Sequence, residues 1–261
     1  FGYSNELIST HDMLRELRED EDNLVDEAAY IRARLFDMLI GDWDRHEDQW
    51  RWAKFKEGDK VIYRPMPRDR DQAFSIMADG ALLGFTTKVV PALRLMQSYD
   101  EELKSPKWFN LEPYPLDVAL INQSTRTDWD KQVLHIMENL TNEVIDNAFA
   151  YFPKEVHDET IKEIKRKLIG RRTNLQNISN TYYNQVNKYA IIKGTDKDDW
   201  FEIERNKKLT KITGYRIQQE KKGEIFHERT YSHIDTKEIW IYGLDDEDVF
   251  EKERHAGKAI K

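Results

Sequence analysis

The chain has 261 residues, with 39% hydrophobic and 11% aromatic residues, which indicates a folded globular protein rather than a disordered one. Lys and Arg number 41 against 49 Asp and Glu, and the resulting net charge of −8 argues against broad nucleic-acid binding. Cysteine is absent, which excludes disulfides, thiolate metal sites and a cysteine nucleophile.

Membrane and targeting signals are also missing from the sequence. No apolar stretch approaches the roughly 18 residues that a membrane-spanning helix requires, so we expect no transmembrane segment. The sequence opens at Phe1 with neither a methionine nor a signal peptide. We therefore expect that the chain is a fragment of a longer protein.

The first part of the chain predicts two helices. Ser9 or Thr10 can cap a short helix that runs through Arg18, and Asp26 begins a second helix that ends at Gly41. Apolar residues at helical spacing give this second helix a buried face: Ala29, Ile31, Leu35, Met38 and Leu39.

A hairpin near residues 49–64 follows the second helix. Residues 49–55 alternate in polarity, residues 57–59 form a turn signal, and residues 61–65 return as a second strand. From residue 75 to residue 115 the pattern is mixed and broken by prolines.

The rest of the chain predicts a helical region and then a β region. Apolar residues between residues 127 and 186 recur at steps of three, four and seven, which predicts one long helix: Ile161, Ile164, Leu168, Leu175 and Ile178. After residue 187, short β-rich runs predict an antiparallel sheet of about five strands. The predicted fold class is α+β, with a mainly helical domain at residues 1–186 and a small antiparallel β domain, truncated at its end, at residues 187–261.

Two acidic loops flank the predicted hairpin. The first spans residues 41–50 and reads GDWDRHEDQW, and the second spans residues 66–74 and reads MPRDRDQAF. Because a hairpin brings its two ends together, we expect the loops to lie side by side, with Asp44, Asp69 and Asp71 near a common point. Clustered carboxylates require arginine partners or a hard cation such as Mg²⁺ or Mn²⁺.

The spacing within these loops is typical of phosphoryl transfer. In protein kinases a metal-binding Asn follows the catalytic Asp by about five residues, and a second metal-binding Asp comes later. Here Gln49 follows Asp44 by five residues, and Asp69 lies 69 − 44 = 25 residues on, beyond the predicted hairpin. Gln offers the same amide oxygen as Asn on a longer side chain.

Together the loops resemble the paired motifs of atypical kinase-like families: the spore-coat CotH kinases, the secretory-pathway kinases and the HipA-type toxins. The resemblance implies a kinase C-lobe-like fold and a site that binds Mg²⁺ or Mn²⁺, with ATP as the candidate nucleotide. It implies these roles: catalytic Asp44 and His46, cofactor-binding Arg45 and Arg68, and metal-binding Gln49, Asp69 and Asp71.

The chain departs from the pattern of these families in three ways. Gln49 replaces the usual Asn, and Arg68 stands where the CotH pattern has Trp. Only 43 residues precede Asp44, too few for a kinase N-lobe with its glycine-rich loop and phosphate-binding Lys. Either those parts lie outside this chain, or the site does not transfer phosphoryl groups.

A wider resemblance concerns residues 30–52, the Arg171-Arg172 and Tyr182-Tyr183 pairs, and residues 236–250. These are similar to a segment of bacterial envelope proteins that carry a metallophosphoesterase domain upstream and an outer-membrane surface-antigen barrel downstream. The resemblance implies a periplasmic or cell-envelope location and other domains as partners, and a cytoplasmic location is also compatible with the sequence.

Two functions therefore stay open. The first is an envelope-protein fragment with a kinase-like site that binds a divalent metal and phosphate. The second is a non-catalytic interaction or scaffolding module of a metallophosphoesterase-linked outer-membrane protein. Independently of these two, the loops have a purely structural interpretation: Asp44 caps the hairpin, Arg45 pairs with Asp42 or Asp37 in a polar corner, and residues 68–71 form a ladder of ion pairs.

Overall fold

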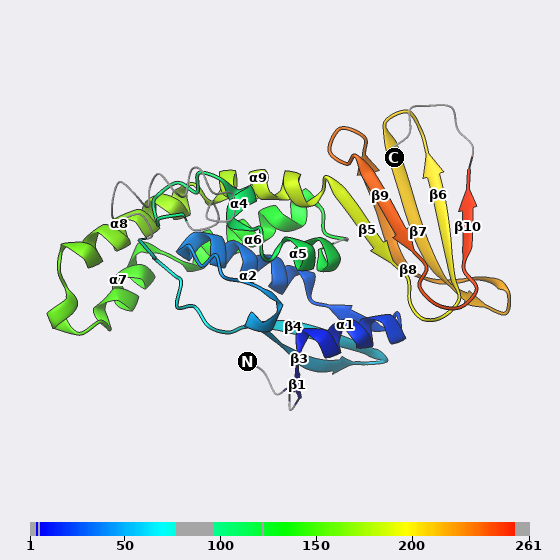
Figure 1. Cartoon of the computed structure of the whole chain (residues 1–261), viewed down its shortest axis with the longest axis horizontal. Coiled ribbons are helices and arrows are strands. Elements are labelled where there is room, and N and C mark those ends of the chain that lie inside the picture. The colour runs from blue at the N-terminus through cyan, green and yellow to red at the C-terminus, as the bar shows by residue number, and fades with distance from the viewer. Residues whose placement is uncertain (1–3, 5, 77–96, 122, 254–261) are drawn as a thin grey trace.

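The computed structural model describes residue 4 and residues 6–76, 97–121 and 123–253. It confirms the α+β class (Figure 1). The helices α2 to α9 form one layer, which lies against the sheet formed by β1 to β4. The strands β5 to β10 stand at one end of this layer, and α7 and α8 extend at the other end.

The N-terminal part is a four-stranded sheet with two helices. Its elements are β1 (Leu7–Ile8), α1 (Thr10–Glu19), β2 (Asn23–Val25), α2 (Glu27–Ile40), β3 (Trp50–Glu57) and β4 (Lys60–Pro67). The predicted hairpin is confirmed, since β3 and β4 pair antiparallel from Glu57 with Lys60 to Trp50 with Pro67. The strand order is β1-β3-β4-β2, so the hairpin is central.

Both predicted helix starts are confirmed. Ser9 Oγ accepts a hydrogen bond from the Asp12 N–H at 3.1 Å, and Asp26 Oδ1 accepts one from the Ala29 N–H at 2.9 Å. Helix α2 ends at Gly41, whose φ of 78° lies in the left-handed region that favours glycine. The chain thus leaves α2 directly into the first acidic loop.

The helical layer contains more turns than the apolar pattern predicts. Its further helices are α4 (Pro106–Phe109), α5 (Tyr114–Leu120), α6 (Arg126–Asn139), α7 (Asn142–Ala150), α8 (Glu159–Thr173) and α9 (Leu175–Val186). The prediction of one long helix through residues 161–178 is wrong, because α8 and α9 meet at Asn174. The Asn174 side chain donates to the Glu101 carbonyl at 3.3 Å, and an Asn that bonds to backbone favours a helix end.

The described β region forms a mixed four-stranded sheet and a two-stranded parallel sheet rather than one antiparallel sheet. Its strands are β5 (Tyr189–Lys193), β6 (Asp199–Arg205), β7 (Leu209–Gln218), β8 (Lys221–Ser232), β9 (Glu238–Tyr242) and β10 (Val249–Lys252). Strands β6, β7 and β8 pair antiparallel as expected, whereas β10 joins β6, and β5 joins β9, in parallel.

Two hydrophobic clusters fill the molecule. The larger joins α2, the hairpin tryptophans Trp50 and Trp52, and the helices through Val186. The smaller lies between the C-terminal sheets and includes Ile192, Phe201 and Ile212. Among the described residues, none of the helices has the length and apolar character that crossing a membrane requires.

Candidate functional site

The two acidic loops lie side by side, as the hairpin predicts. The Arg68 N–H donates to the Gln49 carbonyl at 2.8 Å, just beyond the end of the β3–β4 ladder. Farther along, the Phe74 N–H donates to the Ile40 carbonyl at 2.9 Å. The second loop is therefore held at both ends against the first.

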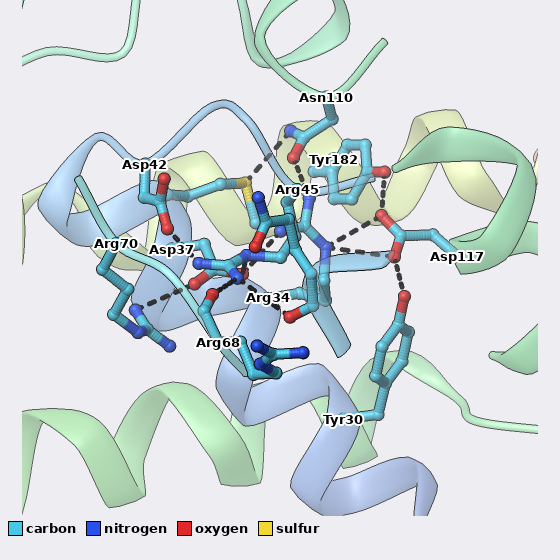
Figure 2. A network of polar contacts seen from close by, with 12 residues as sticks. Tyr30, Arg34, Asp37, Asp42, Arg45, Arg68, Arg70, Asn110, Asp117 and Tyr182 are labelled. Carbon is cyan, nitrogen blue, oxygen red and sulfur yellow. Dashed lines mark hydrogen bonds and ion pairs between the residues drawn. The ribbon is translucent and has the colours of Figure 1, made fainter. Parts of the chain in front are cut away.

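Arg45 joins the two loops from inside the protein (Figure 2). Its side chain has no exposed surface, and its guanidinium lies 3.2 Å from Asp37 Oδ2 and forms a second ion pair with Asp42. The guanidinium also donates to the carbonyls of Gln49, at 3.3 Å, and Arg68. Every contact of this guanidinium is thus intramolecular and buried, so a direct contact of Arg45 with a cofactor does not fit the geometry.

The ion pairs of Arg45 continue into a larger buried network. Arg34 Nη1 lies 2.8 Å from Asp37 Oδ2, and Arg34 Nε lies 3.0 Å from Asp117 Oδ1. Asp117, on α5, also accepts hydrogen bonds from the hydroxyls of Tyr30, at 2.7 Å, and Tyr182. Sequence reasoning missed Arg34 and Asp117. The spacing of Arg34 and Asp37, three residues apart on α2, could have indicated an ion pair within the helix, but it carries no information on Asp117.

Arg70 extends this network to the second loop. Its Nη1 lies 2.9 Å from Asp37 Oδ1, so Asp37 meets three arginines: Arg34, Arg45 and Arg70. The predicted ladder of ion pairs along residues 68–71 is wrong, because the Arg70 side chain points inward to Asp37. Desolvation lowers the pKa of Arg70, against the opposing effect of Asp37.

Burial also shifts the pKa of Asp42, the acid that follows Gly41. Desolvation raises the pKa of Asp42 to about 6, although its ion pair with Arg45 opposes the shift. The alternative reading of the first loop as a polar corner is therefore right for Arg45 and Asp42. These two residues hold the loop, and the other acids of the loop, Asp44 among them, take no part in this ion pair.

The remaining acids of the two loops lie at the surface, although Asp44 is half-buried. Asp44 lies 4.0 Å from His46 Nε2, and Asp69 and Asp71 are exposed. The Asp71 N–H donates to Asp69 Oδ1 at 3.4 Å, and Asp69 has a left-handed φ of 47°. Within the described ranges, no lysine or arginine pairs with these three carboxylates.

The predicted metal ligands do not form a complete coordination group by themselves. The described part of the chain contains no group of three or more His, Asp or Glu residues placed to hold a metal ion. A cation at these loops would thus need oxygens from a bound phosphate or water beside those of the protein. The Arg68 side chain is exposed, whereas its carbonyl is used by Arg45.

We compared the chain with protein-family models, curated proteins and solved structures, and none of the three comparisons gave a match.

Proposed function

We propose that the chain is a fragment of a bacterial envelope protein with a phosphotransferase-like site for a divalent metal and phosphate. The observation that carries the proposal is the hydrogen bond from the Arg68 N–H to the Gln49 carbonyl at 2.8 Å. It brings the loop of Asp44 against the loop of Asp69, which is the juxtaposition that phosphoryl transfer requires.

The division of the acids supports the same proposal. Asp37 and Asp42 are buried and paired with arginines, so they stabilise the loops and have no oxygen to offer to solvent. Asp44 and Asp69 lie at the surface of the same loops without such partners among the described residues. Exposed carboxylate oxygens are the ligands that Mg²⁺ and Mn²⁺ prefer.

In the proposed reaction, Asp69 and Gln49 would hold a divalent cation, which would neutralise phosphate charge of a nucleotide such as ATP, with Asp71 as an accessory acid. Arg68 contacts the phosphate, and Asp44 accepts the proton of the acceptor hydroxyl while His46 shapes the loop. The hydroxyl oxygen forms a bond to the γ-phosphorus as the bond to the bridging oxygen breaks, and ADP leaves. The envelope location rests on the sequence resemblance alone.

Calorimetric titration with Mn²⁺, in the absence and presence of ATP, tests this site. We expect saturable Mn²⁺ binding by the unmodified chain and at least about tenfold weaker binding by Asp69→Asn, because a ligand carboxylate is lost. Asp59→Asn is the matched control, since Asp59 is an exposed acid at the other end of the same hairpin. Absence of heat under both conditions, or equal binding by Asp69→Asn, would refute the proposal.

The alternative function is a non-catalytic interaction module. Several large apolar side chains of the β region are exposed, with Trp240 at 50% and Phe250 at 52% of their surface. Such side chains are typical of a protein contact surface. Under this alternative the chain binds neither Mn²⁺ nor ATP, and a photo-crosslinker at position 240 captures a partner that one at the exposed Arg15 does not.

A further inference from the structure

A pocket of about 600 Å³ opens beside the second acidic loop. Its walls come from α2, from α6 and from the β3–β4 hairpin, and Arg70 of the second acidic loop also lines it. This volume is within the range of about 300–1,000 Å³ that small-molecule sites occupy. The size alone therefore suits a small ligand.

The charge of this pocket contrasts with that of the whole chain. The chain has a net charge of −8, yet three arginines line the pocket: Arg32, Arg64 and Arg70. His135 is a fourth basic side chain in the lining, and none of the lining residues that the structure describes is Asp or Glu. The pocket is thus complementary to an anion.

The present partners of the arginines show which guanidinium would bind an added anion most strongly. Arg64 pairs with Asp26 at 3.3 Å and with Glu57 at 3.0 Å. Arg32 instead donates to the neutral amide oxygen of Gln132 at 3.0 Å, and no carboxylate in the part of the chain that the structure describes pairs with it. A carboxylate or phosphate at Arg32 would form a charge-assisted hydrogen bond, which is stronger than a bond to an amide.

Arg70 adds little to this attraction, because Asp37 already pairs with it from the core side. Its guanidinium lies 5.0 Å from the centre of the Phe36 ring, and that of Arg64 lies 4.4 Å from the Phe55 ring. These two aromatic faces are consequently covered by cations of the protein itself.

The rest of the lining is aliphatic. Ala33 on α2, Met66 and Pro67 on β4, and Ile136 on α6 are representative of it. Such a surface offers few hydrogen bonds to the edges of a polar base, and it favours an alkyl chain. A nucleotide base therefore suits this pocket less well than an aliphatic body does.

We propose that this pocket binds a small amphipathic anion, with its alkyl chain on the aliphatic wall and its carboxylate or phosphate group at Arg32. The metal site plays no part in this binding, so the two proposals stand or fall separately. A fatty acid and an alkyl phosphate lipid share this chemistry, and their affinities distinguish the two sources.

Calorimetric titration in metal-free buffer, below the micelle concentration, tests the pocket with octanoate, nonanoate, decanoate and decyl phosphate. We expect about fourfold tighter binding for each added methylene, because each buried methylene contributes a similar free energy. Decanol and decyltrimethylammonium serve as neutral and cationic head groups on the same chain, and both should bind at least about tenfold more weakly than decanoate. The tighter of decanoate and decyl phosphate identifies the natural head group.

Two variants locate the site. Arg32→Gln should weaken decanoate binding by at least about tenfold without changing the affinity for decanol, whereas Arg15→Gln, on the exposed face of α1, should change neither. Ala33→Trp should abolish binding by filling the pocket, provided that circular dichroism shows it folded. Equal affinities for decanoate and decanol, unchanged binding by Arg32→Gln, or no binding of either anion would overturn the proposal.

Discussion

Replacement of Arg45 by Lys is the sharpest test of how the two loops are held together. The change keeps the positive charge but replaces a planar group with five donors by a compact ammonium with three. Arg45 contacts Asp37 and Asp42 and the carbonyls of Gln49 and Arg68 from a fully buried position. A lysine at this position cannot reach all four groups.

The magnitude follows from the contacts that are lost. The hydrogen bond from the charged group to the Arg68 carbonyl contributes about 1.5–3 kcal/mol, and that carbonyl loses its donor. The Gln49 carbonyl keeps its bond from the Arg68 N–H and loses only a second, longer bond worth about 1 kcal/mol. The guanidinium also lies 5.4 Å from the Trp50 ring centre, a contact of about 0.5–1 kcal/mol. We therefore expect Arg45→Lys to lower the free energy of unfolding by about 3–5 kcal/mol.

Urea unfolding followed by tryptophan fluorescence and by circular dichroism measures this loss. With a slope of about 3 kcal/mol per molar, the midpoint should fall by about 1–1.7 M. Arg51→Lys is the control, because the Arg51 guanidinium donates to the backbone carbonyls of Asp48 and Trp50 near the surface and forms no ion pair with another described residue. An Arg45→Lys midpoint within about 0.3 M of the unmodified chain would show that the clamp does not act as described.

Two further predictions concern stability. Burial and the nearby Arg229 lower the pKa of His227 to about 4. Between about pH 6.5 and pH 4 the imidazole is therefore protonated in the unfolded chain but neutral in the folded chain. The stability contribution of His227 is thus present above pH 6.5, and about 3 kcal/mol of it is lost as the pH falls to 4. His227→Gln should abolish this loss in urea midpoints measured across that pH range. The same pH dependence of the midpoint in His227→Gln and the unmodified chain would contradict the prediction. At Gly41, with φ at 78°, an added Cβ would lie 2.7 Å from Tyr99 Cδ2, so Gly41→Ala should cost about 2–4 kcal/mol. Gly58→Ala, where φ is 66° and no atom lies within 4 Å of the added Cβ, should cost only about 1 kcal/mol, and equal costs would exclude the close approach.

Local signals predicted the scaffold of the candidate site. Asp26 at the start of α2, Gly41 at its end and the turn at residues 57–59 each act through neighbouring backbone groups. The hairpin then places the two acidic loops together by geometry alone. This part of the site could therefore be predicted without knowledge of any distant contact.

The parts that were missed depend on contacts between distant residues. Arg34 and Asp117 lie 83 residues apart, and neither the partner nor the burial of either can be read from the neighbouring sequence. The end of α8 at Asn174 was hidden because Leu168 and Leu175 stay buried on both sides of it, which keeps the apolar pattern in phase. Likewise, the parallel partners of β5 and β10 lie 49 residues away in the sequence (238 − 189 and 249 − 200), where alternation carries no information on pairing.

The central place of the hairpin in the order β1-β3-β4-β2 has a consequence for local unfolding. Sheets open from their edges, and here the edges are the short strands Leu7–Ile8 and Asn23–Val25. The amide of Arg68, which bonds to Gln49 at the end of the central strands, should consequently exchange its hydrogen with solvent more slowly than the edge amides do. The loops that carry Asp44 and Asp69 can face solvent because the most protected strands of the sheet anchor them.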